Sequence, residues 1–204
     1  MVRSVNNALR RVPIWGVWLA GTLPLVVLIF DLMTNNVGVD PIRSIEYRLG
    51  QTAVYFLVAG LAVTPLLRLT GISFMRWRRA LGVICFSYAV LHVLAWVVLD
   101  MGLLWSQMAR DIVKRPYLLF GMGAFLILTA LAVTSNNLSI RKMGGRAWRT
   151  LHKLVYPAAI LVALHWLWVV KVAGGAPVFW AVVIVVLLLS RIVVRRPIRF
   201  GLGF

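Results

Sequence analysis

Three histidines, His92, His152 and His165, are the side chains of this sequence whose type could do chemistry. All lie within apolar stretches or at their edges, where an ionisable group is costly and normally faces the interior of a helix bundle. A single histidine in such a place has two equally good explanations, a hydrogen bond between helices or a functional role. Because these stretches carry no carboxylate at mid-depth, the relative depths of the three histidines become informative.

Spacing from the preceding basic residues places two of the histidines at one depth. With a rise of about 1.5 Å per residue, His92 lies about 20 Å beyond Arg79. On the same basis His165 lies about 24 Å beyond Arg149, whereas His152 lies only about 5 Å beyond it. Helix bundles commonly build cofactor sites from side chains on facing helices. We therefore expect His92 and His165 to bind one metal from two sides.

The other side chains available at the depth of the two histidines decide which metal suits this pair. Zinc needs three or four N, S or O ligands, and no carboxylate or thiolate lies at that depth. Haem brings four nitrogens of its own and needs only one or two axial ligands. Since the sequence lacks the C-x-x-C-H motif of covalently attached haem, it favours haem b. A proton relay or plain hydrogen bonding between helices stays open, although relays usually include Asp or Glu within the spans.

Six apolar stretches must position these histidines. They cover roughly residues 13–33, 52–67, 80–98, 117–134, 151–170 and 176–190, against the ~20 residues that a bilayer core needs. The chain is 62% hydrophobic and only 13% charged, whereas soluble domains have about 25% charged residues. The sequence predicts an all-α membrane protein, a six-helix transmembrane bundle that forms a single transmembrane haem-binding domain over residues 1–204.

The distribution of charge predicts the topology. With the N-terminus inside, sixteen Lys and Arg residues and no acid fall on the inner side. Six cations and all five acids fall on the outer side. This positive-inside bias predicts both ends in the cytoplasm, an N-in/C-in arrangement. The net charge of +17 reflects topology, because nucleic-acid-binding domains gather basic residues on one exposed face. We expect membrane lipid around the chain and no nucleic acid partner.

Several segments, in order along nearly the whole chain, resemble one known family. The second and fourth stretches carry Leu61-Ala62-Val63-Thr64-Pro65-Leu66 and Lys114-Arg115-Pro116-Tyr117. The third carries Arg78-Arg79-Ala80-Leu81-Gly82, Ser87-Tyr88-Ala89 and Leu91-His92. The fifth carries Trp148-Arg149-Thr150-Leu151-His152-Lys153-Leu154-Val155-Tyr156 and then His165. These segments are similar to the MsrQ (YedZ) family and, more distantly, to the transmembrane domains of ferric reductases and NADPH oxidases.

The resemblance implies electron transfer through b-type haem across the bacterial inner membrane. The implied acceptor is a periplasmic methionine sulfoxide reductase that contains molybdopterin (the molybdenum cofactor) and repairs oxidised proteins. The implied donor is the quinone pool or a cytoplasmic flavin reductase, with FMN as an associated cofactor. By motif match, His92, His152 and His165 carry over as haem ligands. The chain would be an electron-transfer subunit without catalytic residues of its own.

Two departures from the oxidase relatives bear on these implications. Those relatives stack two haems between paired histidines on both helices; here His152 and His165 keep that spacing, but Arg79 occupies the position that would pair with His92. We therefore expect one haem b and leave a second one open, because an inner haem would lack its usual second ligand. Pro157 lies between His152 and His165, and a proline kink would re-aim one of them. The chain also has no nicotinamide-binding motif, so electrons must enter from a soluble flavoprotein or from quinol.

Two other functions stay open. One is a self-sufficient ferric or quinone reductase-like cytochrome of the same fold. The other is a non-redox transporter or scaffold in which the histidines merely hold helices together. Transporters often show interrupted helices in repeated halves, and this sequence shows no internal repeat.

Overall fold

The computed structural model describes residues 2–170 and 175–193, and within them every regular element is helical. Six spans are long and apolar enough to cross a membrane. Four are single helices, α2 (Ile14–Met33), α3 (Pro41–Thr70), α6 (Pro116–Val133) and α10 (Ala176–Val193). The other two combine consecutive elements: Met75–Asp100 contains α4 (Arg78–Ala95) and the π-helical turn η2 (Trp96–Asp100), and Gly145–Val169 ends with α9 (Val155–Val169). The six spans coincide with the six apolar stretches. The prediction of an all-α membrane protein with six spans is confirmed.

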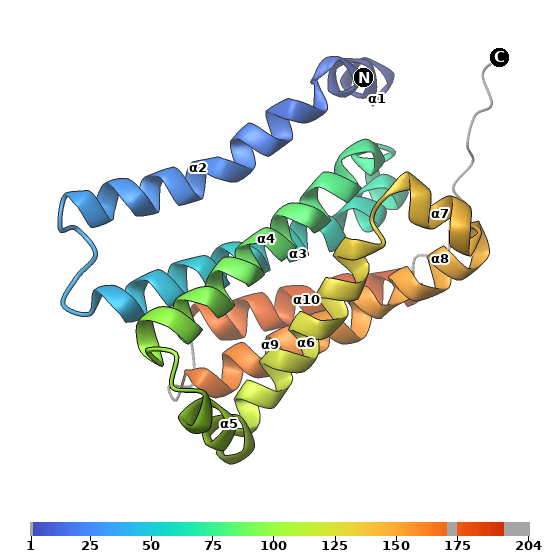
Figure 1. The fold of residues 1–204 in the computed structure, drawn as a ribbon. Helices are drawn as coiled ribbons and strands as arrows, with labels where there is room; N and C mark the ends of the chain where they lie inside the picture. The colour runs from blue at the N-terminus through green and yellow to red at the C-terminus, as the bar shows by residue number, and fades with distance from the viewer. Residues whose placement is uncertain (1, 171–174, 194–204) are drawn as a thin grey trace.

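Short helices cover the two ends of the bundle. They are α1 (Val2–Arg11), the 3-10 turn η1 (Met75–Trp77), α5 (Trp105–Lys114), α7 (Asn137–Met143), α8 (Gly145–Leu151) and the 3-10 turn η3 (His152–Leu154). Figure 1 shows α1, α7 and α8 at one end and α5 at the other. Hydropathy does not reveal α1, α5 or α7 because they are short and polar.

Helix α3 is longer than the apolar stretch 52–67. Asp40 caps its N-terminus, because the carboxylate accepts a 3.0 Å hydrogen bond from the Arg43 N–H and Pro41 occupies the first turn. Gly71 ends it in the left-handed conformation with a φ of 76°. The additional outer turns are polar, so a search for apolar residues misses them. These turns carry Glu46 and Gly50, which contact the site described below.

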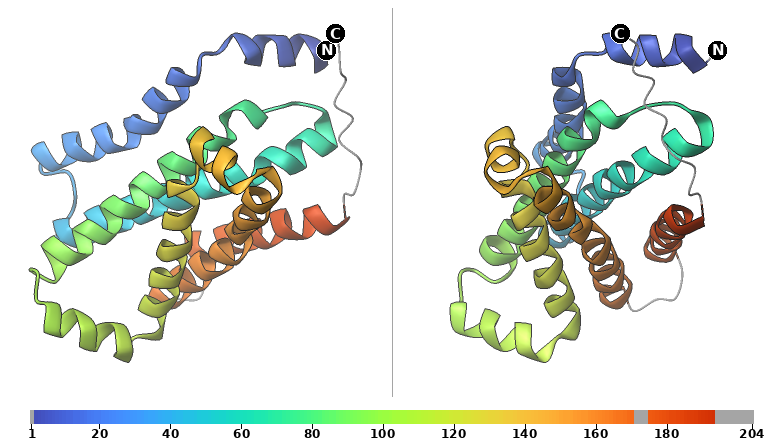
Figure 2. Two further views of the ribbon diagram at one scale, coloured as in Figure 1. Left: turned by 45° about the vertical axis from the view of Figure 1, so that its right-hand side comes forward. Right: turned by 90° about the vertical axis from the view of Figure 1, so that its right-hand side faces the viewer.

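The spans pack as two antiparallel hairpins, one made of α3 and α4 and the other of α6 and α9. Helix α4 meets α6 between the hairpins, α10 lies against α9 and α3, and α2 lies on the outside against α4 (Figures 1 and 2). The most buried residues include Leu61 and Val63, each 2% exposed, Ala158 and Ala159, both 0% exposed, and Ile184, 1% exposed. Cys85 is buried in the hydrophobic core as well.

One end of the molecule is strongly basic. Thirteen of the sixteen cations that were expected inside belong to α1, α7, α8, η1, η3 or the adjoining ends of α3, α4 and α10. These elements share one end of the bundle (Figure 1). The other three, Arg195, Arg196 and Arg199, and the outer Lys171 lie outside the described residues. The separation of charge along the bundle axis therefore follows the predicted topology.

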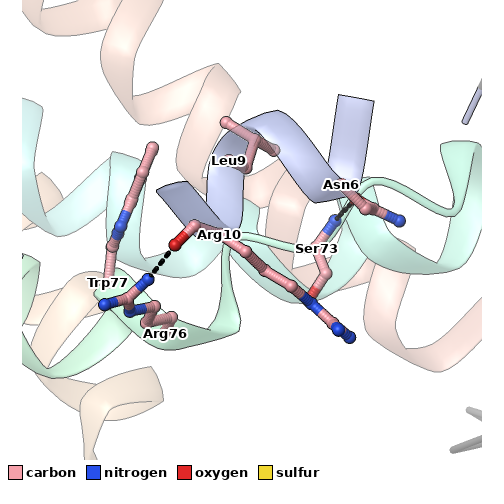
Figure 3. Close-up of a pocket in the computed structure, with 6 residues that line it drawn as sticks. All are labelled: Asn6, Leu9, Arg10, Ser73, Arg76 and Trp77. Carbon is pink, nitrogen blue, oxygen red and sulfur yellow. Dashed lines mark hydrogen bonds between the residues drawn. The ribbon is translucent and has the colours of Figure 1, made fainter. Parts of the chain in front are cut away.

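Helix α1 lies across this basic end (Figure 2). The Asn6 side chain donates to the Gly71 carbonyl at 3.0 Å and accepts from the Ser73 N–H at 2.9 Å. The Arg76 guanidinium donates to the Arg10 carbonyl at the end of α1 (Figure 3). These bonds attach α1 to the turn between α3 and α4.

Candidate functional site

The structure brings two of the three histidines together. His92 lies near the end of α4 and His165 near the end of α9, and both side chains are half-buried. Their ring centres are 6.3 Å apart and their planes are inclined at 75°. Both residues lie toward the end of the bundle that carries α5, opposite the basic end (Figure 1). The common depth expected from the rise per residue thus corresponds to a close approach of two imidazoles.

Each imidazole is held by a main-chain carbonyl of the neighbouring helix. His92 Nδ1 lies 2.9 Å from the Glu46 carbonyl oxygen of α3, and His165 Nδ1 lies 2.8 Å from the Tyr117 carbonyl oxygen of α6. A carbonyl oxygen can only accept, so each Nδ1 must carry the proton and donate. Each Nε2 then keeps a free lone pair. This is the tautomer in which an imidazole binds a metal through Nε2.

The separation of the rings fits a metal ion between them. Two imidazoles that bind one ion from opposite sides, through bonds of about 2 Å, have ring centres about 6 Å apart. The observed separation is 6.3 Å, and no hydrogen bond joins the two rings in the part of the chain that the structure describes. Within the same residues no third His, Cys, Asp or Glu completes a cluster. The pair therefore suits a group that brings its other metal ligands with it.

Aromatic side chains lie near the pair, and one of them contacts His165 directly. Trp166, which follows His165 and is 9% exposed, makes an edge contact with Tyr47 of α3 with ring centres 6.2 Å apart. The Tyr117 ring lies 6.2 Å from the ring of His165. These contacts come from both hairpins and give the pair apolar surroundings. Such surroundings suit a large apolar macrocycle.

His152 lies apart from the pair, near the basic end. It begins η3, the 3-10 turn before α9, where Pro157 lacks the N–H that would bond to the Lys153 carbonyl. Its ring stacks on Trp148 with centres 3.9 Å apart, and its Nε2 lies 3.2 Å from the Thr134 hydroxyl. That hydroxyl donates its only proton to the Ala130 carbonyl at 2.7 Å, so it accepts from His152. His152 is thus protonated on Nε2, whereas His92 and His165 are protonated on Nδ1.

The sequence of this chain is similar to those of known proteins. The model of the family described as ferric reductase like transmembrane component matches residues 15–163. Curated relatives include the "protein-methionine-sulfoxide reductase heme-binding subunit MsrQ" of Brucella anthropi, which is 44% identical over 186 residues, 90% of this chain and 83% of the relative. The proteins of the same name from Brucella ovis and Brucella canis are each 45% identical over the same shares. The chain belongs to the MsrQ family.

In this MsrQ family member, the range matched by the ferric reductase like model contains His92 and His152 and ends two residues before His165. The predicted family resemblance is confirmed. The role of the three histidines as ligands stays a prediction. What the sequence did not reveal is the set of groups that hold the ligand pair, the carbonyls of Glu46 and Tyr117 and the glycines near them. Main-chain groups leave no signal of their own in residue types.

Proposed function

We propose that this MsrQ family member is the haem-binding membrane subunit of a methionine sulfoxide reductase system, in which His92 and His165 hold haem b. The observation that carries the proposal is the 6.3 Å separation of two imidazoles whose Nδ1 atoms are both taken by carbonyls. The haem and the methionine sulfoxide reductase in this proposal are taken from the names of the Brucella relatives. The proposal joins this geometry to those names.

The two histidines fit the requirement of haem for axial ligands. A haem iron changes between ferric and ferrous states, so haem bound here carries one electron at a time. The protein's part is to present two Nε2 lone pairs from opposite sides and to keep the rings from rotating. The hydrogen bonds to the Glu46 and Tyr117 carbonyls do both, and they also make each imidazole a stronger electron donor.

The position of the pair favours delivery to the outer side. His92 and His165 lie toward the end that carries α5, which the charge bias assigns to the periplasm of a bacterial inner membrane. An acceptor docked on that face is closer to the pair than one at the basic end. We infer that the acceptor is the periplasmic molybdopterin-dependent methionine sulfoxide reductase, which repairs oxidised proteins.

We infer that the electron donor delivers its electrons at the basic end. Quinol within the bilayer and a cytoplasmic flavin reductase are the two sources that the family resemblance implies, with FMN as an associated cofactor. His152 lies at this end and is proposed as a ligand only for a second, inner haem. To act so it would have to leave either its stack on Trp148 or its bond to Thr134.

The proposal is tested by absorption and EPR spectroscopy of detergent-purified protein from haem-replete cells. We expect a Soret band that shifts on reduction with dithionite and a low-spin EPR signal. His92→Ala and His165→Ala should each abolish the same low-spin signal, because each removes one of two ligands to one iron. Retention of that signal in both variants would refute the pair, and a protein purified without haem would refute the function.

The family match supports a second candidate function. Because the matching model is described as a ferric reductase like transmembrane component, the chain could reduce iron chelates or quinones without a protein partner. Reconstitution of the reduced protein in vesicles separates the two candidates. We expect reoxidation by a periplasmic methionine sulfoxide reductase of the molybdopterin class, and slower reoxidation by ferric citrate; the reverse order would favour the reductase alternative.

A further inference from the structure

The two hairpins hold their histidines in the same way. In α3 the carbonyl of residue 46 accepts from His92, and residue 50, four positions later, is glycine. In α6 the carbonyl of residue 117 accepts from His165, and residue 121, again four positions later, is glycine. The sequence around the two glycines is otherwise unlike. The shared feature is a carbonyl followed by glycine at the fourth position.

Helix geometry gives this spacing a physical meaning. A carbonyl inside an α-helix accepts from the N–H four residues later, and the Cβ of that later residue lies beside the oxygen. Three threonines of this protein illustrate the point, because the hydroxyls of Thr52, Thr70 and Thr129 each reach the carbonyl four residues earlier at 2.7–2.8 Å. A side chain at this position therefore covers the second lone pair of the oxygen. Glycine leaves it open.

The imidazoles occupy the space that a Cβ would need. A Cβ on Gly121 would lie 2.8 Å from His165 Nδ1, and a Cβ on Gly50 would lie 3.1 Å from His92 Nδ1. Both are tighter than ordinary van der Waals contact. By contrast, a Cβ on Gly60 of α3 would meet nothing within 4 Å, and one on Gly123 of α6 would meet only the Leu161 side chain at 3.4 Å. Among the glycines within α3 and α6, the close approach is confined to the two beside the histidines.

We propose that Gly50 and Gly121 are positioning residues for the ligand pair, which keep the Glu46 and Tyr117 carbonyls open to the Nδ1–H groups of His92 and His165. This inference rests on the proposed function, because it assigns these glycines to haem ligation. Gly50 and Gly121 thereby determine which ring nitrogen of the neighbouring histidine carries the proton and how closely that ring approaches its carbonyl. The two hairpins thus form two equivalent halves of one site.

The proposal predicts an effect on both binding and redox behaviour. Alanine at either position pushes the imidazole away from its carbonyl and weakens the Nδ1–H···O=C bond. Loss of a hydrogen bond that orients a ligand typically weakens metal binding about 10–100-fold. The imidazole also becomes a weaker donor to ferric iron, so the midpoint potential rises. Gly121→Ala should have the larger effect, because its contact distance is shorter.

The experiment compares Gly50→Ala with Gly60→Ala and Gly121→Ala with Gly123→Ala, so that each control lies on the same helix. Haem content, the low-spin EPR signal and the midpoint potential are measured for purified proteins. We expect weaker haem retention, a displaced EPR signal and a raised potential in Gly50→Ala and Gly121→Ala only. Equal behaviour of the test and control variants would overturn the proposal.

A second background separates positioning from general damage to the helix. In His165→Gly, externally added 1-methylimidazole can bind the iron through its lone pair but has no N–H to donate to the Tyr117 carbonyl. Adding Gly121→Ala to this variant should therefore cause no further loss of the haem binding that 1-methylimidazole supports. A further loss as large as that in the native background would mean that the alanine acts on folding. Wild-type protein without haem would instead refute the proposed function, so the two failures are distinguishable.

Discussion

At the scale of single residues, proton positions distinguish the three histidines. His92 and His165 donate from Nδ1 to main-chain carbonyls and leave Nε2 free, whereas His152 donates from Nε2 to a hydroxyl. An imidazole that donates from Nε2 has only Nδ1 left for a metal, and Nδ1 lies closer to its own backbone. The motif match alone treats His152 and His165 as equivalents, and local hydrogen bonding shows that they differ.

This difference predicts the number of haems. We expect a pyridine haemochrome assay, normalised to protein, to give one haem per chain, because the described residues supply one pair of imidazoles with free Nε2 atoms. His152→Ala should keep the low-spin signal that His92→Ala and His165→Ala lose. Two haems per chain, with one lost in His152→Ala, would make His152 a ligand.

The Tyr88 hydroxyl is a second feature that acts at the scale of one residue. It donates to the Gly21 carbonyl at 2.7 Å and accepts from the Leu25 N–H at 3.1 Å, two groups that an uninterrupted helix would join to each other. Pro24 lies in the same turn of α2. The hydroxyl thus enters the hydrogen-bond ladder of α2 and attaches that helix to α4.

Tyr88→Phe should destabilise the protein without removing haem. It leaves a carbonyl and an N–H unpaired in an apolar layer, at a cost of about 1–3 kcal/mol. Thermal unfolding in detergent measures this loss. Tyr47→Phe is the matched control, because Tyr47 is 43% exposed and its hydroxyl accepts only a 3.5 Å hydrogen bond from Gln51. Equal stability of the two variants would contradict the role assigned to Tyr88.

At the scale of helices, prolines create main-chain groups that other helices must satisfy. Pro65 has no N–H for the Leu61 carbonyl, which lies four residues earlier in α3. Arg191 of α10 donates to that carbonyl at 2.6 Å and to the Tyr156 hydroxyl of α9 at 3.0 Å. One guanidinium therefore joins α10 to both hairpins at the basic end. A sequence pattern shows the proline and the arginine but not their pairing.

A double-mutant cycle tests this pairing. Arg191→Met should lower the free energy of unfolding by about 1–3 kcal/mol, because the Leu61 carbonyl is left without a donor. In the Pro65→Ala background the helix supplies its own N–H, so the same substitution should cost less. Unfolding by denaturant in mixed micelles measures the four proteins. Additive effects would show that Arg191 does not act through this carbonyl.

At the scale of the whole molecule, the site is assembled from two hairpins of the same design. In each, a helix that runs inward supplies the carbonyl and glycine, and a helix that runs outward supplies the histidine. The acceptor and donor residues are 46 positions apart in one hairpin and 48 in the other. Because the hairpins meet chiefly through α4 and α6, a change in this contact should alter the separation of the two imidazoles.

The orientation of the molecule is tested by labelling with a membrane-impermeant maleimide. Single cysteines are introduced in a Cys85→Ala background at exposed positions, Ser106→Cys on α5 and Ser4→Cys on α1. We expect Ser106→Cys to react in intact spheroplasts and Ser4→Cys to react only after lysis, because the distribution of Lys and Arg predicts that the basic end faces the cytoplasm. Wild-type Cys85, which is 2% exposed, should not react in either case. The opposite pattern would reverse the topology.

Much of this architecture could be predicted from the sequence, because the determining properties are local. Hydropathy places the six spans, the distribution of Lys and Arg separates the two ends, and a constant rise per residue sets His92 and His165 at one depth. None of these properties depends on how the helices are rotated. The family resemblance rests on the same local segments.

The tertiary structure alone decided what the imidazoles do. Whether they face each other, which nitrogen each leaves free and which carbonyls hold them all depend on the rotation and approach of helices far apart in the chain. The same holds for Gly50 and Gly121, whose missing Cβ atoms matter only because an imidazole from another helix fills the space. The depth of a histidine depends on its own helix, whereas the arrangement of the two imidazoles depends on four helices, α3, α4, α6 and α9.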